Sequence, residues 1–201
     1  MSERPATSDA PETRVAIMEA TYRALCEHGY ANLTTQRIAD ELGKSTALLH
    51  YYFESKEALL VAFLEYLLTR LDTRVTEEVA TPPERLAVLV DTLLPGPDAA
   101  SDIGIALLEM KAQSPYTAAF RTQLRANDER IEALIESIIA DGLETGDFAA
   151  VDPSLVAERL LILIEGARTR SVVLDSTEPR RVGRATIEAY LASLRGGGDA
   201  G

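Results

Sequence analysis

The chain has a single cysteine, two histidines and no tryptophan among its 201 residues. Cys26 alone cannot close an internal disulfide, and one thiol with two imidazoles is too few for a Cys/His zinc site. The sequence also lacks an apolar run of the roughly 18 to 20 residues that a membrane span needs, and Met1–Pro11 is polar where a leader would be apolar. We therefore expect a cytoplasmic protein with no disulfide framework, metal or cofactor.

Basic residues are scarce as well, and lysine is the scarcest. Thirty-two acidic residues against twenty basic ones give a formal charge of −12 at pH 7, and lysine occurs only at Lys44, Lys56 and Lys111. Such a surface repels nucleic acid and anionic membranes, so any contact with DNA has to be local. Two explanations for the arginine-rich composition stay open. One is a GC-rich genome, and the other is a salty cytoplasm in which acidic surfaces keep proteins soluble.

Apolar residues, by contrast, are plentiful and recur every three or four positions, the spacing of amphipathic helices. They make up 46% of the sequence, which is enough for a core. No segment alternates apolar and polar residues around hairpin-type turns, and no internal repeat is visible. The pattern predicts an all-α fold of about nine helices: Glu12–His28, Thr34–Gly43, Ser45–Tyr52, Lys56–Val79, Glu84–Leu94, Ser101–Gln113, Pro115–Gly142, Pro153–Leu174 and Pro179–Leu194.

Two short helices near the N-terminus are separated by a tight turn. Thr34 is placed to cap the first, which ends at Gly43, and Ser45 is placed to cap the second. Ser55 then caps a long helix. Two helices joined by a three- to four-residue turn containing glycine are typical of a helix-turn-helix, whereas the plain alternative is an antiparallel helical pair in a bundle.

The segment Leu33–Leu59, LTTQRIADELGKSTALLHYYFESKEAL, resembles the DNA-binding signature of the TetR family of transcriptional regulators. The shared features are the threonine cap, the Ile38–Ala39 pair, Gly43 in the turn, Ser45 at the start of the second short helix, the aromatic pair Tyr52–Phe53, and Ser55, Lys56 and Glu57. The resemblance covers the first 60 or so residues and is architectural beyond them. The spacing from Ser101 through Gly166 resembles the betaine-type branch of the family.

The resemblance implies a domain organisation. It places a three-helix helix-turn-helix domain at residues 11–55 and a helical ligand-binding and dimerisation domain at residues 56–195. Residues 1–10 and 196–201 are small, polar and rich in helix breakers, so we expect disordered tails there.

A recognition helix presents short or planar polar side chains to base edges while its other face packs on the preceding helix. Leu49 and Phe53, four residues apart, form the expected packing face. The expected DNA-contacting residues are Thr35, Gln36, Ser45, Thr46, Ala47, Leu48, His50, Tyr51, Tyr52 and Lys56. His50 and Ala47 depart from the family's usual tyrosine and its usual glycine or proline, so an operator cannot be borrowed from a relative.

Polar residues on apolar helix faces suggest where a small-molecule effector binds. Tyr116, Phe120, Leu124, Ile131, Leu134 and Ile138 form an apolar stripe that also holds Asn127. Because a polar group on an apolar face needs a partner, Asn127 either faces a ligand or bonds a neighbouring helix. The candidate effector residues are Glu109, Met110, Gln113, Phe120, Leu124 and Asn127, and the plain alternative for the apolar ones is core packing.

The last two helices carry more apolar residues than a terminal hairpin needs for its own core. The resemblance implies that this pair forms a four-helix bundle with a second copy. We expect the dimer contacts at Leu160, Leu163, Ala167, Ser171, Leu174, Ile187, Leu191 and Leu194.

The sequence thus predicts a homodimeric repressor that binds a palindromic DNA operator and is released by a small-molecule effector. An activator or a regulator without a ligand is the alternative within the class. A helical dimer that has lost DNA binding and acts as a protein-interaction module is the alternative outside it, motivated by the charge of −12. An enzyme is the least favoured reading, because no hydrolase motif, phosphate loop or metal-ligand cluster is present and no catalytic residue is predicted.

Overall fold

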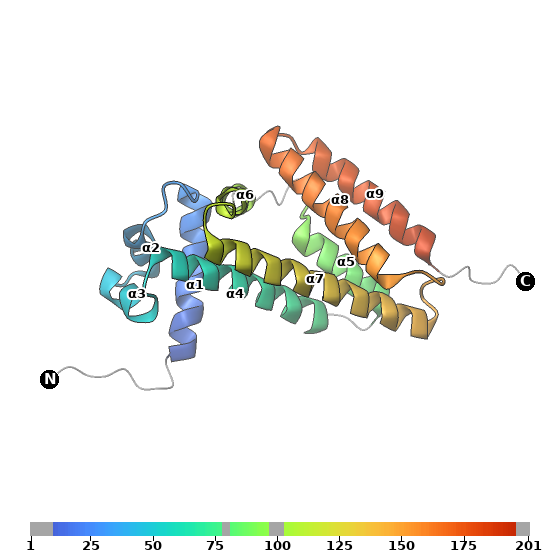
Figure 1. The fold of residues 1–201 in the computed structure, drawn as a ribbon, viewed down its shortest axis with the longest axis horizontal. Helices are drawn as coiled ribbons and strands as arrows, with labels where there is room; N and C mark the ends of the chain where they lie inside the picture. Colours follow the sequence, from blue (N-terminus) through green and yellow to red (C-terminus); the bar gives the residue numbers. More distant parts are fainter. Residues whose placement is uncertain (1–9, 78–80, 97–102, 196–201) are drawn as a thin grey trace, which may run out of the picture. The chain divides into compact units, whose positions relative to one another are not determined.

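The structure is a computed structural model that describes residues 10–77, 81–96 and 103–195. Within these ranges the chain is all-α with nine helices and no strand, which confirms the predicted fold class (Figure 1). The helices are α1 (Ala10–His28), α2 (Thr35–Leu42), α3 (Thr46–Tyr52), α4 (Lys56–Glu77), α5 (Pro82–Leu93), α6 (Ile103–Gln113), α7 (Ala118–Thr145), α8 (Pro153–Val173) and α9 (Glu178–Leu194).

Parts of several predictions fall beyond these ranges. The expected tail at residues 196–201 lies outside the described residues, as does the tail at 1–10 except for Ala10, which is the first residue of α1. Residues 78–79 and 101–102, expected at two helix ends, also lie outside them.

Local capping chemistry explains where the helices begin and end. The Thr34 hydroxyl accepts the Arg37 N–H at the start of α2, and the Asp152 carboxylate accepts the Ser154 N–H at the start of α8. Gly29 and Gly43 follow α1 and α2 with φ of +68° and +66°, a backbone conformation that glycine adopts at no steric cost. One expected cap is absent, because Ser45 precedes α3 without a side-chain hydrogen bond to it.

The chain divides into two compact units. One comprises residues 1–66 with 101–124, and the other comprises residues 67–100 with 125–201. Helices α4 and α7 each contribute to both units. The boundary expected at residue 55 therefore falls inside the first unit, because the first turns of α4 and all of α6 belong with α1–α3.

The first unit is built around α1. Helix α1 packs against α2 and α6, and α2 packs against α3. Its fully buried large side chains come from all five helices and the start of α7, namely Ile17, Leu25, Ile38, Leu49, Leu59, Leu60, Phe63, Met110 and Phe120. Tyr116, expected in the apolar stripe, is instead 86% exposed, because α7 begins only at Ala118 and Tyr116 lies in the preceding turn.

The second unit has a core drawn from α4, α5, α7, α8 and α9, with α8 and α9 packed side by side as a hairpin (Figure 1). The loop after α7 folds back on this core. Phe148 occupies the space where a side chain on Gly142 would lie, and the Ala149 N–H donates to the Leu194 carbonyl at 2.7 Å. The end of α9 is thereby fixed to the α7–α8 loop.

Candidate DNA-binding site

The α2–turn–α3 segment has the geometry of a helix-turn-helix. Gly43 ends α2, and its N–H donates to the Asp40 carbonyl at 3.1 Å. Leu49 and Phe53 are 1% and 7% exposed, so the packing face of α3 is confirmed. The opposite face of α3 is left free for a partner.

All ten predicted DNA-contacting residues lie at the surface or are half-buried, and none is buried. The exposed ones are Gln36, Ser45, Ala47, His50 and Tyr51, and the half-buried ones are Thr35, Thr46, Leu48, Tyr52 and Lys56. Tyr51 is 74% exposed, and its ring meets that of Tyr52 edge-on with 5.2 Å between centroids. The structure brings these residues together around one helix-turn-helix.

Two of the ten donate side-chain hydrogen bonds to other described residues. The Gln36 amide donates to the Asp40 carboxylate at 2.7 Å, one turn along α2, so it must leave this bond to reach a base. The Lys56 ammonium donates to the Leu33 carbonyl at 2.5 Å and lies 5.1 Å from the centre of the Tyr30 ring. Burial lowers the pKa of Lys56 from its usual value. The structure thus gives Lys56 an anchoring role between the start of α4 and the loop before α2, in addition to the expected phosphate contact.

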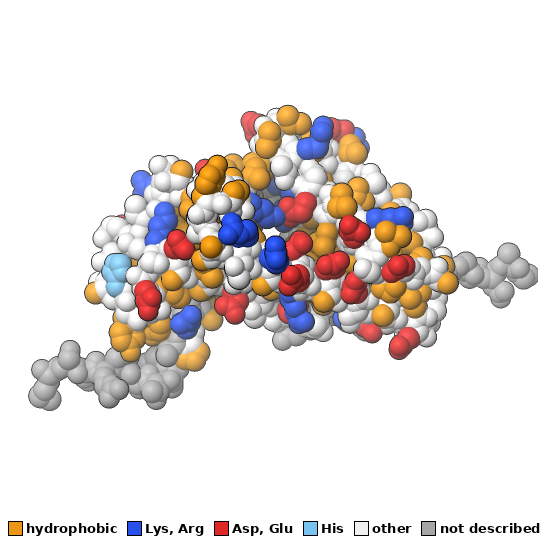
Figure 2. Space-filling view, viewed as in Figure 1, with side chains coloured by type: hydrophobic (Ala, Val, Ile, Leu, Met, Phe, Trp, Pro, Cys, Tyr) orange, Lys and Arg blue, Asp and Glu red, His pale blue; other side chains and the backbone are white. Residues whose placement is uncertain are grey.

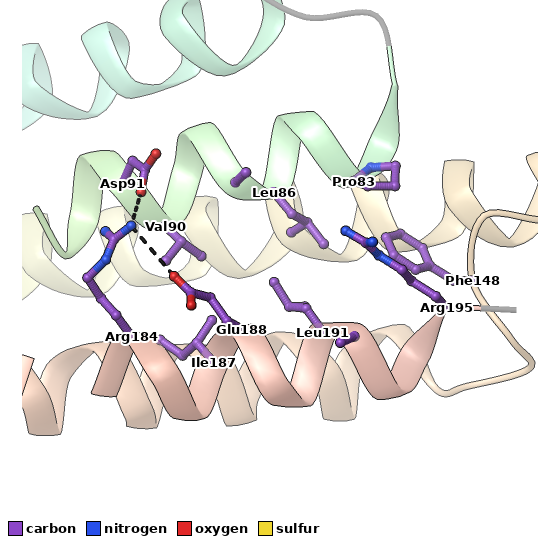
Figure 3. A pocket seen from close by; sticks show the side chains of 12 residues that line it. Pro83, Leu86, Val90, Asp91, Phe148, Arg184, Ile187, Glu188, Leu191 and Arg195 are labelled. Carbon is purple, nitrogen blue, oxygen red and sulfur yellow. Dashed lines mark hydrogen bonds and ion pairs between the residues drawn. The ribbon is translucent and has the colours of Figure 1, made fainter. Parts of the chain in front are cut away.

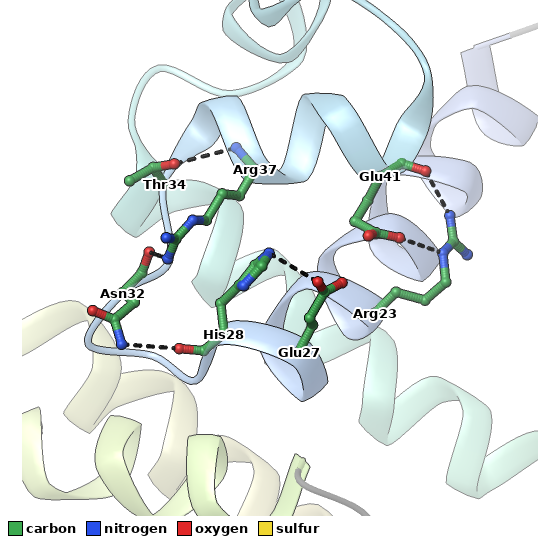
Figure 4. Close-up of polar contacts among 7 residues, drawn as sticks. All are labelled: Arg23, Glu27, His28, Asn32, Thr34, Arg37 and Glu41. Carbon is green, nitrogen blue, oxygen red and sulfur yellow. Dashed lines mark hydrogen bonds and ion pairs between the residues drawn. The ribbon is translucent and has the colours of Figure 1, made fainter.

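A polar network holds α2 against α1 (Figure 4). The Arg23 guanidinium donates to the Glu41 carboxylate and to the Glu41 carbonyl, each at 3.0 Å. The Arg37 guanidinium donates to the Asn32 carbonyl at 2.6 Å, and the Asn32 amide donates to the His28 carbonyl at 3.3 Å. These bonds fix the orientation of the helix-turn-helix on α1.

Sequence reasoning missed two basic residues of this unit. Lys44 is exposed in the turn between α2 and α3, and Arg14 is exposed on α1 with its guanidinium 4.9 Å from the centre of the Phe53 ring. Lys44 was detectable because it follows the turn glycine. The position of Arg14 depends on a contact between residues far apart in sequence, which periodicity does not reveal.

Charge around the helix-turn-helix is balanced. Leu33–Lys56 holds three basic and three acidic residues, so the whole formal charge of −12 resides elsewhere. On the face shown in Figure 2, acidic side chains are scattered among apolar and basic ones. The candidate DNA surface is a neutral region of an acidic chain.

The candidate effector residues are divided between the two units. Met110 and Phe120 are 0% and 1% exposed and belong to the core of the first unit. The Glu109 carboxylate accepts the Tyr30 backbone N–H at 2.7 Å. Gln113, Leu124 and Asn127 are half-buried, and Asn127 belongs to the second unit. Met110 and Phe120 are therefore core residues, as the alternative to an effector-binding role predicted.

A groove of about 310 Å³ runs between α5 and α9 of the second unit (Figure 3). Leu86, Val90, Ile187 and Leu191 are among its apolar lining residues, with Phe148 near one end. At the other end the Arg184 guanidinium binds the Asp91 carboxylate at 2.5 Å and lies 3.9 Å from Glu188. None of the six expected effector residues lines this groove.

The expected dimer contacts differ in how much surface they keep within one protomer. Leu160, Ala167, Ser171, Ile187 and Leu194 are at most 7% exposed within the chain itself, and Leu163 and Leu191 pack against its core. Only Leu174 of the predicted set is exposed, at 55%. The five buried side chains fill the core of one protomer and offer little surface to a second, whereas Leu163, Leu174 and Leu191 keep some.

The described part of the chain shows no cluster of three or more His, Cys, Asp and Glu residues that could hold a metal ion. None of the helices in the described ranges is both long and apolar enough to cross a membrane.

Comparison with known families agrees with this geometry. The family described as "Bacterial regulatory proteins, tetR family" matches residues 17–63, and the family described as "BetI-type transcriptional repressor, C-terminal" matches residues 82–196. The chain is 29% identical to the HTH-type transcriptional regulator BetI of Rhizobium meliloti (strain 1021), over 97% of this chain and 96% of that protein.

Two solved structures resemble the chain along most of its length. A TetR transcription regulator from Haloarcula marismortui ATCC 43049 is 46% identical, with a TM-score of 0.80, over 92% of this chain and 99% of that one. A putative transcriptional regulator from Saccharomonospora viridis, solved in complex with choline, is 30% identical, with a TM-score of 0.70, over 89% of this chain and 96% of that one. With a helix-turn-helix at its N-terminal end and a BetI-type C-terminal part, the chain belongs to the TetR family of DNA-binding transcriptional regulators.

Proposed function

We propose that the protein is a homodimeric repressor in which α3 of each protomer enters the major groove of a palindromic operator. The observation that carries this proposal is the contrast between the two faces of α3. Leu49 and the adjoining Phe53 are buried on one face, and the other face is uncovered. A helix that is apolar on one side and open on the other can pack on its own domain and contact bases at once.

The residues of the open face divide into two roles. Thr46 and His50 offer hydrogen bonds to base edges, while Ala47 and Leu48 offer apolar contact to a thymine methyl group. The backbone contacts come from Thr35, Tyr51, Tyr52 and Lys56, which would hold phosphates. Gln36, near the start of α2, would reach a base edge once it leaves Asp40, and Ser45 directly precedes α3. Lys44, exposed in the turn, adds a cation to this set.

A second copy is proposed to pack on the outer face of the α8–α9 hairpin. Ile162 and Val173 of α8 are 64% and 67% exposed, and Val182 of α9 is 48% exposed. Gly166, exposed between Ile162 and Val173 on the same helix, allows another helix to approach closely. Dimerisation would hold two recognition helices about 34 to 36 Å apart, which is one turn of DNA.

An organic small molecule is proposed to release the repressor. The support is the choline complex of the relative from Saccharomonospora viridis. A ligand shifts the equilibrium between two states only by its different affinity for them. Helix α4 is the proposed coupling element, because it starts beside the helix-turn-helix and contributes to both compact units.

Fluorescence anisotropy on DNA from the upstream region of the protein's own gene tests the DNA-binding role. We expect saturable binding at one or two dimers per site and no comparable binding to a scrambled duplex. Tyr51→Ala should weaken binding at least tenfold, because Tyr51 flanks the recognition face. Tyr116→Ala, which removes another highly exposed tyrosine outside the helix-turn-helix, is the matched control and should bind as wild type. Absence of any preference over the scrambled duplex, extended to genome-wide fragments, would refute the proposal.

Sedimentation velocity tests the dimer face. Ile162→Arg should convert the dimer to a monomer, because it places a charge on the proposed apolar contact. Val15→Arg replaces an exposed apolar residue of α1 and should leave the dimer intact. A dimer that survives Ile162→Arg would place the interface elsewhere.

A further inference from the structure

The Nε of Arg180 is a buried donor with no hydrogen-bond partner among the described residues. Arg180 lies in the first turn of α9 and is 7% exposed. Among the described residues it forms no ion pair. Arg184, one turn further along α9, is fully engaged by contrast, since it donates to the Leu94 carbonyl at 2.8 Å and to Asp91. A buried donor without an acceptor is costly, so the Nε of Arg180 calls for an explanation.

The packing of α8 against α9 places a second unsatisfied group, the Ser171 hydroxyl, at the same end of the hairpin as Arg180. A side chain on Gly183 would lie 2.5 Å from the Ala167 Cβ, and the Arg159 guanidinium donates to the Tyr190 hydroxyl at 3.3 Å. These pairs show that the two helices run antiparallel. Ser171 lies one turn beyond Ala167, and Arg180 lies one turn before Gly183, so both are at the same end of the hairpin.

Ser171 shares the condition of Arg180. It is 7% exposed, and its hydroxyl has no hydrogen-bond partner. The Ser171 hydroxyl and the Arg180 Nε are both buried, both lack a hydrogen-bond partner, and both lie at the same end of the hairpin. One ligand group could therefore satisfy both. Both groups can donate, so the missing partner is an acceptor.

Arg168 adds positive charge to this end of the hairpin. Burial lowers the pKa of Arg180, and the charge of Arg168 lowers it further. Arg168 itself binds Glu165, one turn back on α8, at 3.3 Å. Arg180, Arg168 and Glu165 together have a net charge of +1, in a chain whose formal charge is −12.

We propose that Arg180, Ser171 and Arg168 form a binding site for the carboxylate group of a small organic acid. A carboxylate carries a single negative charge, which balances the net charge of Arg180, Arg168 and Glu165, whereas a phosphate dianion would leave a buried negative charge in its place. Its two coplanar oxygens match the fork of a guanidinium, and the Ser171 hydroxyl can donate to one of them. The site lies within the second unit and does not depend on DNA reading or on the dimer face.

Thermal unfolding of the full-length protein, followed by circular dichroism at 222 nm, tests the site. The probes are sodium acetate and sodium benzoate, each paired with its neutral amide, acetamide or benzamide, with KCl holding the ionic strength constant. At least one acid should raise the melting temperature in a saturable way, by about 3 to 6 °C, while the amides have no effect. Equal stabilisation by chloride or phosphate would overturn the assignment to a carboxylate.

Two substitutions at Arg180 and Arg170 locate the effect. Arg180→Met should abolish the acid-dependent rise and leave the melting temperature without acid unchanged or higher, because it removes an unsatisfied buried donor. Arg170→Met removes an exposed arginine of α8 and should keep the full response. If Arg180 were a structural residue, its replacement would lower the melting temperature without acid and spare any response.

Ser171→Ala provides a second variant that is expected to fold. It should raise the Kd of the acid several-fold, because it removes one of the donors. An acid response that survives both Arg180→Met and Ser171→Ala would overturn the proposal. No DNA is present in these measurements, so their failure leaves the repressor proposal standing, and the failure of DNA binding leaves this site standing.

Discussion

The Glu109 carboxylate accepts a hydrogen bond from the Tyr30 backbone N–H at 2.7 Å, across 79 residues of sequence. Tyr30 follows Gly29, the left-handed residue that ends α1, and its ring meets that of Phe120 edge-on with 6.2 Å between centroids. Helix α6 and the start of α7 are therefore tied to the end of α1. Any ligand that moves α6 acts on the helix that carries the helix-turn-helix.

Replacement of Glu109 by alanine should lower the free energy of unfolding by about 1 to 2 kcal/mol, because a half-buried N–H loses a charged acceptor. Glu109→Gln keeps an acceptor and should recover part of that loss. Urea unfolding at pH 7 measures both variants. Equal stability of Glu109→Ala and wild type would show that water replaces the carboxylate at no cost.

The lowered pKa of Lys56 predicts that the stability of the protein depends on pH. Because burial lowers its pKa in the folded protein, the unfolded chain binds more protons between that lowered pKa and the ordinary value of 10.5. The contribution of Lys56 to stability should therefore increase as pH rises toward 10.5. Burial and the charges of Glu57 and Glu109 raise the pKa of Tyr30, whose contribution is present below 10.0 and is lost as pH rises through its folded pKa.

The difference between wild type and Lys56→Gln isolates the lysine, since both proteins keep Tyr30. Urea unfolding at pH 8 and pH 10 should show that difference shifting in favour of wild type at the higher pH. A difference that stays constant, or shifts toward Lys56→Gln, would contradict a lowered pKa.

Two glycines of the α8–α9 hairpin should respond oppositely to alanine. At Gly183 the new methyl group would lie 2.5 Å from the Ala167 Cβ, so we expect Gly183→Ala to destabilise the fold by about 1 to 3 kcal/mol. At Gly166 nothing lies within 4 Å of the new group, and Gly166→Ala should stabilise α8 by about 0.5 to 1 kcal/mol. Because Gly166 belongs to the proposed dimer face, both are compared by urea unfolding in the Ile162→Arg background. Similar effects at both sites would mean that α8 and α9 pack less closely than described.

The affinity for DNA should depend only weakly on salt. Of the basic residues in Leu33–Lys56, Arg37 and Lys56 already donate to backbone carbonyls, which leaves Lys44 as the most available cation. We expect a plot of log affinity against log KCl concentration with a slope shallower than about −4 for the dimer, or about two neutralised phosphates per protomer. A steeper slope would reveal basic contacts beyond this segment.

The origin of the acidic, lysine-poor composition is testable by the same titration without DNA. If the surface is adapted to a salty cytoplasm, solubility and melting temperature should rise from low to molar KCl. Indifference of both to salt would favour a GC-rich genome as the cause.

The fold and the helix-turn-helix were predictable because they rest on local signals. Thr34, Gly43 and Ser55 act within four residues of the helix ends that they set, and the spacing of Leu49 and Phe53 identifies the buried face of α3 and its C-terminal cap. The anchoring role of Lys56 was not predictable, because its acceptor, the Leu33 carbonyl, lies 23 residues away.

The dimer and effector surfaces were harder to predict because helical periodicity finds apolar faces without saying what covers them. Helix α8 is apolar on two sides, and packing on α9 and the rest of the core decides that Leu160 is buried while Ile162 is exposed. In the same way, Met110 and Phe120 have the composition of a pocket lining but fill the core of the first unit. Only the three-dimensional arrangement separates these cases.

The bond between the α7–α8 loop and the end of α9 has a consequence for synthesis on the ribosome. The Ala149 N–H finds its acceptor only in Leu194, so the second unit cannot complete its packing until that residue has left the exit tunnel. All segments of the first unit, which ends at Leu124, emerge much earlier. The helix-turn-helix is therefore expected to fold while the remaining helices are still being translated, with α4 and α7 exposing apolar side chains that a chaperone would recognise.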